Sequence, residues 1–172
     1  MDTLAHMTTH DSHHAFSALL QRHAGIVFKI AHGYARQAED RDDLAQEIAA
    51  QLWHAWPSYD PSRSFSTWMY RVALNVAISH LRERSLRDQR DALPLDDEMP
   101  ELASSDGSEH ERDQHIRQLH AFIQRQAPLD RALLMLYLDE RPQREIADIL
   151  GISESNVSTK IGRLKQRIHD EL

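Results

Sequence analysis

The stretch RPQREIADILGISESNVSTKIGRLKQRI, residues 141–168, decides how the C-terminal part of this chain folds. Pro142 is suited to the start of a helix, and Gly151 to the turn that ends it. Ser153 is placed to cap a second helix. In that second helix the apolar residues recur at spacings of four, three and four, namely Val157, Ile161, Leu164 and Ile168. This spacing places them on one side facing a core, so the stretch predicts a helix, a tight turn and a second helix.

The other side of the second predicted helix carries small polar side chains and cations. Such side chains match the base edges and phosphates of a DNA major groove. The residues are Ser155, Asn156, Thr159, Lys160, Gly162, Arg163, Gln166 and Arg167. Gly162 is unusual because glycine costs about 1 kcal/mol in a helix interior; it either allows a close approach to DNA or is merely tolerated. A helical hairpin that only packs is the alternative, but the complete pattern favours DNA binding.

Composition describes an ordinary globular protein. The chain has 172 residues, of which 41% are hydrophobic, so it can form one large domain or two small ones. It has no cysteine, which excludes disulfides and thiolate metal sites. There is no apolar run of about 18 residues and no secretory signal pattern. We therefore expect a cytoplasmic protein with no membrane insertion.

The net charge of -7 is concentrated in one segment. Residues 92–113 contain eight acidic residues and one arginine, which accounts for the whole excess. On either side lie cationic stretches, residues 63–90 and 160–167. The charge pattern therefore predicts an acidic connector between two basic patches.

Hydrophobic spacing indicates helices throughout, with no strand alternation. Helices are expected from Phe16 to Tyr34, over about 42–56, over about 66–87 and again from about Glu109, with a break at Pro128. The predicted fold is all-α, with two small helical domains joined by a flexible acidic linker. The predicted segments are a disordered tail (1–12), a first domain (13–91), the linker (92–113) and a second domain (114–172).

The helix predicted over residues 42–56 has two different faces. One face is apolar and suited to a core: Leu44, Ala45, Ile48, Leu52 and Ala55. The other contains Trp53 beside Asp43, Gln46, Glu47, Ala50 and His54. An exposed tryptophan among acids and amides is a candidate hot spot for a protein partner. The alternative is that Trp53 packs under a neighbouring loop of its own domain.

The helix predicted over residues 66–87 is divided in the same way. Its second stripe combines an aromatic ring, an amide and arginines: Trp68, Arg71, Val72, Asn75, Ser79 and Arg82. The preceding loop adds Tyr59, Arg63 and Phe65. These groups are suited to stacking on bases and binding phosphates, so this surface could receive an unstacked base. The alternative is a solvated arginine face on which Trp68 shields the core.

No pattern in the chain indicates catalysis. A phosphate-binding glycine loop, a nucleophile elbow and an HExxH pair are all missing from the sequence. Four histidines near the N-terminus have spacings that could ligate a metal: His6, His10, His13 and His14. No carboxylate or cysteine pattern completes such a site. We therefore expect no enzyme activity, no cofactor and no metal site.

Together these motifs resemble the extracytoplasmic-function (ECF) group of bacterial RNA polymerase sigma factors. The resemblance covers about residues 14–90 and 115–170. It implies that the first domain is sigma region 2 and the second is sigma region 4. It also implies three partners: core RNA polymerase, through its β′ clamp helices and β flap; promoter DNA; and an anti-sigma factor.

The resemblance assigns three sets of residues. Those implied to bind core polymerase are Asp43, Leu44, Gln46, Glu47, Ala50 and Trp53. Those implied to recognise and melt minus-ten DNA are Tyr59, Arg63, Phe65, Trp68, Arg71, Asn75, Ser79 and Arg82. Those implied to read minus-thirty-five DNA are Ser155, Asn156, Ser158, Thr159, Lys160, Arg163 and Arg167. Ile78 and Gly162 depart from the family pattern.

Two other hypotheses remain open from the sequence. A self-sufficient helix-turn-helix repressor or activator would place Trp53 in a dimer interface. A histidine-based metal sensor would need the N-terminal histidines to bind a metal tightly.

Overall fold

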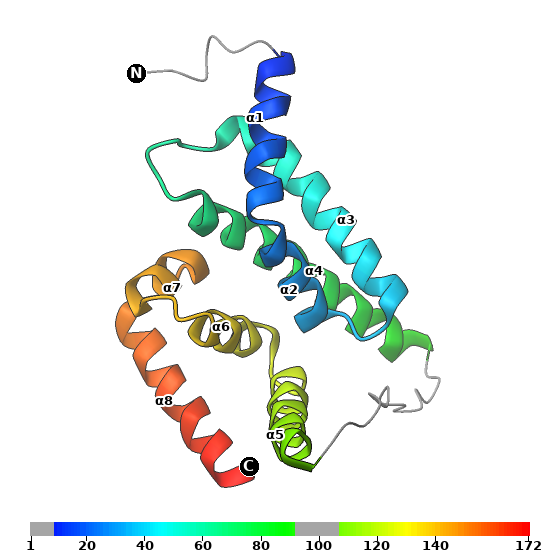
Figure 1. Cartoon of the computed structure of the whole chain (residues 1–172), viewed down its shortest axis with the longest axis vertical. Coiled ribbons are helices and arrows are strands. Elements are labelled where there is room, and N and C mark those ends of the chain that lie inside the picture. The colour runs from blue at the N-terminus through cyan, green and yellow to red at the C-terminus, as the bar shows by residue number, and fades with distance from the viewer. Residues whose placement is uncertain (1–8, 92–106) are drawn as a thin grey trace. The chain divides into compact units, whose positions relative to one another are not determined.

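The computed structural model describes residues 9–91 and 107–172, and every regular element in these two ranges is a helix (Figure 1). The first range contains α1 (Thr9–Arg22), α2 (Ala24–Tyr34), α3 (Ala38–Ala55), the short 3-10 helix η1 (Trp56–Ser58) and α4 (Phe65–Asp91). The second contains α5 (Gly107–Gln124), α6 (Pro128–Leu138), α7 (Gln143–Leu150) and α8 (Glu154–Glu171). The chain divides into two compact units within α4, after His80. The predicted fold class, all-α with two small helical domains, is confirmed.

The N-terminal helices differ from the predicted ones. α1 begins at Thr9, so residues 9–12 of the predicted disordered tail are helical, and the rest of that tail lies outside the described residues. The single helix predicted from Phe16 to Tyr34 is broken at His23, where φ is -111° and ψ is 16°. Spacing did not reveal this break because the buried positions keep a helical spacing on both sides of it. Gly25, a poor helix former, lies just beyond the break.

The start of α5 also corrects a prediction. This helix begins at Gly107, so residues 107–113 of the predicted linker are helical, while residues 92–106 lie outside the described ranges. Glutamate is a good helix former, and Glu111 lies in the second turn of α5. The acidic composition therefore does not exclude a helix here.

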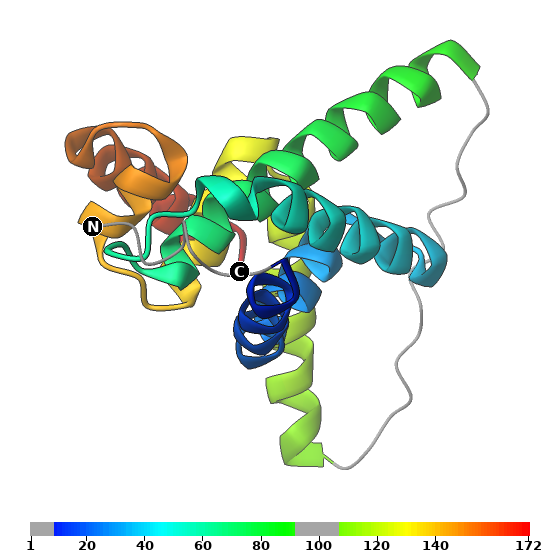
Figure 2. The ribbon, with the colours of Figure 1, turned by 90° about the horizontal axis from the view of Figure 1, so that it is seen from above.

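The core of the first unit comes from one apolar face of each helix. The completely buried side chains are Ile30 of α2, Leu44, Ile48 and Leu52 of α3, and Met69, Ala73 and Ala77 of α4. Leu44, Ile48 and Leu52 are spaced four residues apart, and they belong to the face of α3 that the sequence predicted to be in the core. Figure 2 shows α4 as one long continuous helix, and Leu86 near its C-terminal end is exposed.

The core of the second unit is built from all four of its helices. Its completely buried side chains include Phe122, Leu133, Leu136, Ile146 and Val157. The corner between α5 and α6 is fastened by a buried arginine. The Arg131 Nη2 donates to the backbone oxygens of Gln124, at 2.6 Å, and Gln126, at 3.3 Å. A buried charge needs such partners to offset its lost hydration, so this corner is set by hydrogen bonds as well as by packing. No described helix is long and apolar enough to cross a membrane.

Candidate protein and nucleic-acid interfaces

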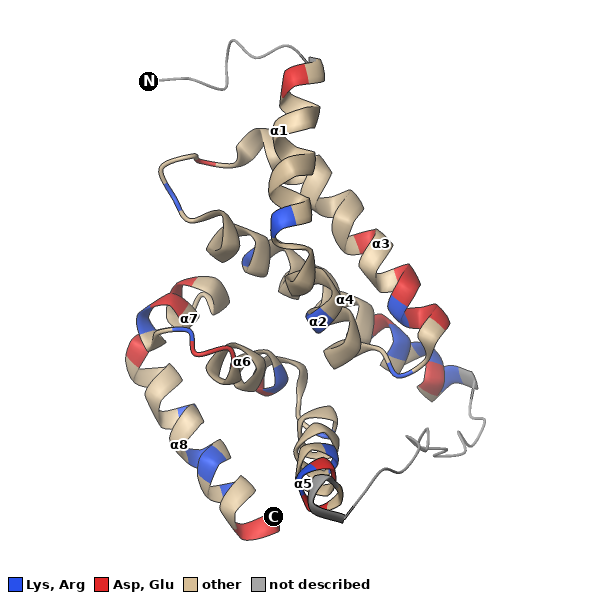
Figure 3. Ribbon diagram, viewed as in Figure 1, with Lys and Arg blue, Asp and Glu red and all other residues tan. Residues whose placement is uncertain are grey.

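The outward face of α3 presents the tryptophan that the sequence predicted to be exposed. Trp53 is 40% exposed, and the surrounding predicted residues are exposed as well: Asp43, Gln46, Glu47 and Ala50. Leu44 is the exception because its side chain is completely buried. A partner cannot touch it, so its place in the predicted polymerase-binding set is wrong. Figure 3 shows acidic residues along the N-terminal half of α3, on a helix that therefore offers carboxylates and one large aromatic ring.

Trp53 is anchored by α1, and the predicted alternative of a covering loop is not what the structure shows. The ring centroid of Trp53 lies 5.1 Å from that of His13, in an edge-on arrangement, and 5.1 Å from that of Phe16. Phe16 is buried, so one side of the indole rests on the core while the other faces outward. An aromatic ring fixed in this way loses little conformational entropy when a partner binds.

A contact between α3 and α4 connects two of the predicted surfaces. The Nδ1 atom of His80 lies 3.6 Å from the Oε2 atom of Glu47. His80 belongs to α4, which carries the predicted minus-ten residues, and Glu47 belongs to the predicted polymerase-binding face. The contact brings the two helix faces close together at this point. This contact could not be predicted from residue spacing, because residues 47 and 80 are far apart in the chain.

The predicted minus-ten residues of α4 lie in one row along its outer side. Arg71, Asn75, Ser79 and Arg82 are exposed, and Trp68 is partly exposed at the start of the row. Their spacings of three or four residues are those of a single helix face. The row therefore offers an amide, a hydroxyl and guanidinium groups side by side. These donors suit the phosphates and base edges of an opened strand.

Phe65 does not belong to this row. Its side chain is 7% exposed, because it packs in a group of aromatic rings at the junction of η1, the loop 59–64 and α4. The ring centroids of Phe65 and Trp68 are 5.4 Å apart, and those of Tyr59 and Trp68 are 5.1 Å apart. The prediction that Phe65 contacts DNA is therefore corrected, since its role is to support the loop. Trp56, which the sequence did not single out, is at the centre of the same group and is 4% exposed.

The loop between η1 and α4 is held by its own polar side chains. The hydroxyl of Tyr59 donates to the backbone oxygen of Arg63, at 2.9 Å. Asp60 Oδ1 accepts from the hydroxyl of Ser62 at 2.7 Å and from its backbone N–H at 3.0 Å. These hydrogen bonds from Ser62 hold the pKa of Asp60 below its ordinary value. Burial, and then the charge of Asp60, raise the pKa of Tyr59, so this phenol stays protonated and can donate.

The turn of the C-terminal motif has the geometry that the sequence predicted. Gly151 has φ of 68°, a left-handed conformation that glycine adopts at little cost. Ser153 then caps α8, because its Oγ accepts from the backbone N–H of Asn156 at 3.1 Å. The predicted core row is confirmed for Val157, Ile161 and Leu164, which are buried. This fixes which side of α8 is turned to solvent.

Five of the seven predicted minus-thirty-five residues lie on the outer side of α8. They are Ser155, Asn156, Ser158, Thr159 and Arg163, and all are exposed. The hydroxyl of Thr159 donates to the backbone oxygen of Ser155, at 3.0 Å, which orients its methyl group and lone pairs. Figure 3 shows Lys and Arg positions in the middle of α8. The outer side therefore offers small polar groups with a cation beside them.

Lys160 and Arg167 also have partners within their own domain. Lys160 Nζ lies 3.3 Å from Asp130 Oδ1 of α6. Arg167 Nη1 donates to Gln126 Oε1 at 2.9 Å, and its guanidinium carbon lies 5.4 Å from the Phe122 ring centroid. Lys160 is partly buried on the flank of α8, whereas Arg167 is exposed. Lys160 is therefore partly engaged in an ion pair with its own domain, whereas the Arg167 side chain is still 52% exposed. Both remain predicted DNA contacts.

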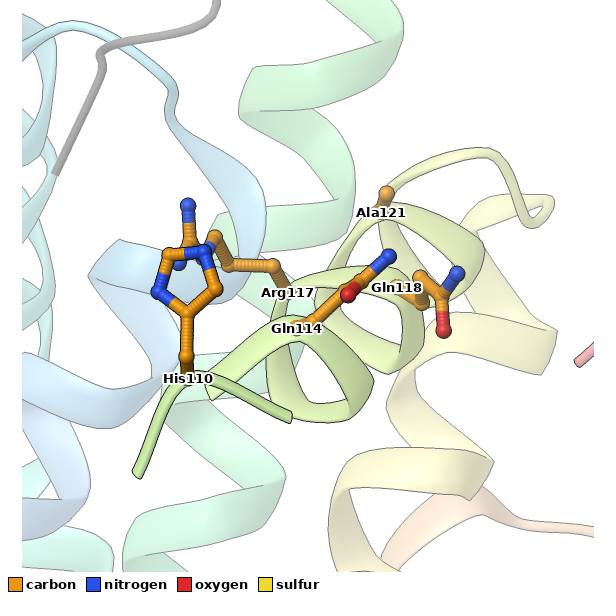
Figure 4. A pocket seen from close by; sticks show the side chains of 5 residues that line it. All are labelled: His110, Gln114, Arg117, Gln118 and Ala121. Atoms are coloured by element: carbon orange, nitrogen blue, oxygen red, sulfur yellow. The ribbon is translucent and has the colours of Figure 1, made fainter. Parts of the chain in front are cut away.

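One stripe of α5 borders a pocket, shown in Figure 4. The lining residues are His110, Gln114, Arg117, Gln118 and Ala121. Among the described lining residues there is one histidine and no carboxylate, so these five form no acid–base pair. The Nε of Arg117 donates to the backbone oxygen of Asp113, at 3.3 Å, within the same helix.

Three of the four N-terminal histidines, His10, His13 and His14, lie in the described part of α1. No three His, Asp or Glu side chains come together there as a metal would require. His13 packs against the ring of Trp53, as described above, and His6 lies outside the described residues.

Two known family models match this chain, and the matched residues include the surfaces described above. Residues 19–87 match the family model of Sigma-70 region 2, and residues 116–168 match that of Sigma-70 region 4. The first match contains α3 and most of α4, and the second contains most of α8. Together they make up more than half of the chain.

Two characterised relatives are ECF RNA polymerase sigma factors. SigE of Mycolicibacterium smegmatis is 26% identical over 166 residues, which is 92% of this chain and 62% of that protein. SigW of Bacillus subtilis is 25% identical over 166 residues, which is 92% of this chain and 89% of that protein. This chain thus spans less than two thirds of SigE but most of SigW. The chain belongs to the sigma-70 family, in its extracytoplasmic-function group.

Solved structures show the same fold. The sigma factor RpoE, in a co-crystal structure with the anti-sigma factor NepR from Bartonella quintana, superposes with a TM-score of 0.73 at 14% identity. That match covers 91% of this chain and 95% of RpoE. CnrH, in complex with the cytosolic domain of CnrY, gives a TM-score of 0.63 at 21% identity and covers 92% of this chain and 87% of CnrH.

Proposed function

We propose that this protein is a sigma factor that binds core RNA polymerase and directs transcription from specific promoters. The observation that carries the proposal is the presence, in one chain and in this order, of a region 2 with an exposed Trp53 face and a region 4 with a polar α8 face. It acts in the cytoplasm as a transcription factor and not as an enzyme.

The proposed polymerase contact is the outer face of α3. Trp53 is its anchor, because a large ring that is preorganised and partly exposed gains much by burial against a partner. Asp43, Gln46 and Glu47 supply charge and hydrogen bonds around it, and Ala50 leaves the surface beside the ring flat. The β′ clamp helices of core polymerase are the proposed partner of this face, and the β flap is the proposed partner of region 4.

The proposed minus-ten contact is the outer row of α4 with the loop before it. Opening duplex DNA costs a few kcal/mol per unstacked step, so a protein that melts DNA must capture the released base. The partly exposed ring of Trp68 offers a stacking surface, and Asn75 offers an amide for a base edge. Arg71 and Arg82 are the proposed phosphate contacts, and Ser79, Arg63 and Tyr59 complete the set.

The proposed minus-thirty-five contact is the outer side of α8, placed in the major groove. Ser155, Asn156, Ser158, Thr159 and Arg163 are the residues that support this proposal. Their polar groups and exposed positions match the donors and acceptors of base edges and phosphates. An anti-sigma factor is the proposed regulator, and masking of the Trp53 face would block polymerase binding.

Transcription with purified core polymerase on a genomic promoter library tests the proposal. We expect discrete new start sites with the wild-type protein and their loss with Trp53→Ala. Phe28→Ala is the matched control, because Phe28 is an aromatic residue of the same unit that is 59% exposed and lies outside the proposed face. Because Trp53 also packs on Phe16, thermal unfolding must show that Trp53→Ala is folded, and Asp43→Lys provides a second variant that leaves the core untouched.

A different result would support the alternative hypothesis, that the protein is a helix-turn-helix repressor. In that case no new transcripts would be made, and the protein alone would bind a palindromic duplex specifically. Trp53→Ala would then weaken dimerisation instead of polymerase binding, which analytical ultracentrifugation would detect.

A further inference from the structure

Gly162 lies in the middle of α8, the helix proposed to enter the major groove. Glycine is among the poorest helix formers, so a glycine within a helix usually has a reason in conformation or in packing. Conformation is not the reason at this position. Gly151 is the only glycine of the described residues with a positive φ.

Packing does not require a glycine at this position either. A Cβ atom placed on Gly162 would meet no atom within 4 Å, and the residue is exposed. Within its own domain an alanine would therefore fit without any shift. It would also make the helix more stable, because alanine loses less conformational entropy on folding.

The position of Gly162 on the helix indicates what the missing side chain is for. At 100° per residue, Gly162 falls opposite the buried row of Val157, Ile161 and Leu164. It shares this outermost side with Ser155 and Thr159, and the exposed Arg163 follows it directly. At Gly162 the outward face of α8 therefore carries no side chain, and the neighbouring side chains on this face can donate hydrogen bonds.

We propose that Gly162 is a specificity-determining position, at which the backbone of α8 comes closest to the base edges of the minus-thirty-five element. This inference rests on the proposed function. Without a side chain at this position, the helix can lie deeper in the groove, and Thr159 and Arg163 reach the base edges and phosphates beside it. A side chain at position 162 would hold the helix away from the bases.

The test separates stability from DNA recognition by using Gly162→Ala and a matched control. Gly25→Ala is that control, because Gly25 is also an exposed helical glycine whose added Cβ would meet nothing within 4 Å, and it lies in α2. Each full-length variant is combined with core polymerase and used to select duplexes from a library randomised at the minus-thirty-five element. Thermal unfolding is measured on the same preparations.

We expect Gly162→Ala to raise the melting temperature of the protein by a few degrees and to lower its affinity for the wild-type element by tenfold or more, or to change the selected sequence. Gly162→Gln introduces a good helix former with a larger side chain than alanine. This variant should lose more affinity for the wild-type element than Gly162→Ala. Gly25→Ala should select the wild-type element with unchanged affinity.

The inference is overturned if Gly162→Ala and Gly162→Gln select the wild-type element with wild-type affinity. Glycine would then be merely tolerated in α8. Failure of the proposed function looks different, because the wild-type protein itself would then select no sequence in the presence of polymerase.

Discussion

The indole N–H of Trp56 donates to the hydroxyl oxygen of Ser12 at 2.9 Å, and this bond joins α1 to η1 across 44 residues of sequence. The Trp56 ring is stacked on that of Tyr59, with centroids 5.3 Å apart and planes 18° apart. Phe16 of α1 contacts both Trp53 and Trp56, with centroid distances of 5.1 and 5.5 Å. α1 therefore supports both the proposed polymerase anchor and the loop of the proposed minus-ten surface.

Ser12→Ala is expected to impair promoter melting more than duplex binding. The change leaves the N–H of a buried indole without its acceptor, at a cost of about 1–3 kcal/mol, and so loosens the ring on which Tyr59 is stacked. Transcription from a duplex promoter should fall, whereas transcription from a template with a pre-melted minus-ten region should remain near the wild-type level. Ser17→Ala, in the same helix, is the control and should leave both unchanged. An equal loss on both templates would show that Ser12 serves stability alone.

Arg163 and Lys160 are expected to differ in their effect on DNA binding although both are cations of α8. Arg163 is exposed on the outer side of the helix, whereas Lys160 is paired with Asp130. Each phosphate contact contributes about -0.9 to the slope of log K against log salt concentration. Arg163→Ala should therefore lower affinity and reduce that slope by about 1, while Lys160→Ala should change the slope little. The measurement is a salt titration of promoter binding by the holoenzyme.

Asp130→Asn provides the control for this comparison. It removes the charge that holds Lys160 and leaves both α8 cations in place. We expect unchanged or slightly stronger DNA binding, and a stability change of no more than about 1 kcal/mol, because the pair is partly exposed to solvent. A loss of slope with Lys160→Ala as large as that with Arg163→Ala would contradict the expectation that Lys160 stays paired with Asp130.

Ser153 and Ser155 are expected to separate helix capping from DNA contact. Ser153 caps α8 through the backbone N–H of Asn156, and its replacement by alanine should cost about 1 kcal/mol of stability. Ser155→Ala, two residues on at an exposed position, should change stability by less than about 0.5 kcal/mol. Only Ser155→Ala should lower promoter affinity without lowering the melting temperature. The reverse assignment of the two effects would overturn the placement of Ser155 in the groove.

The helix faces could be predicted from the sequence because a periodic pattern carries its own geometry. The buried rows of α3 and α8 follow from spacings of three and four, and the turn between α7 and α8 follows from Gly151 and Ser153. The break at His23 could not be predicted in this way, because helical spacing is preserved across it.

The candidate contacts were predicted less completely because residue type does not reveal which way a side chain points. Phe65 and Leu44 are chemically suited to contact a partner, but both are buried. Lys160 and Arg167 are suited to phosphates, but each has a partner within its own domain. The contribution of α1 was missed since it depends on contacts between residues far apart in the chain.

The loop before α4 offers a prediction on pH. Asp60 accepts two hydrogen bonds from Ser62, and these favour its charged form, so its pKa in the folded protein lies below the ordinary value of 3.8. Because the folded pKa is lowered, the stabilising effect of these bonds is present above the pKa of the unfolded chain. It is lost as the pH falls through the lower, folded pKa. The loop should therefore keep its hydrogen bonds at pH values where an unassisted aspartate is already half protonated.

Ser62→Ala tests the effect of these hydrogen bonds on the pKa of Asp60. It removes the hydroxyl, which lowers that pKa more than the backbone N–H does, and leaves the N–H in place. The pKa of Asp60 should rise toward 3.8 without fully reaching it, which NMR titration of the carboxyl carbon would measure. Ser58→Ala is the matched control, because the hydroxyl of Ser58 donates to the backbone oxygen of Ala55 and not to Asp60. An unchanged Asp60 titration in Ser62→Ala would show that the hydroxyl does not hold this loop. A rise confined to Ser62→Ala would instead identify the Ser62 hydroxyl as the group that holds the pKa of Asp60 below its ordinary value.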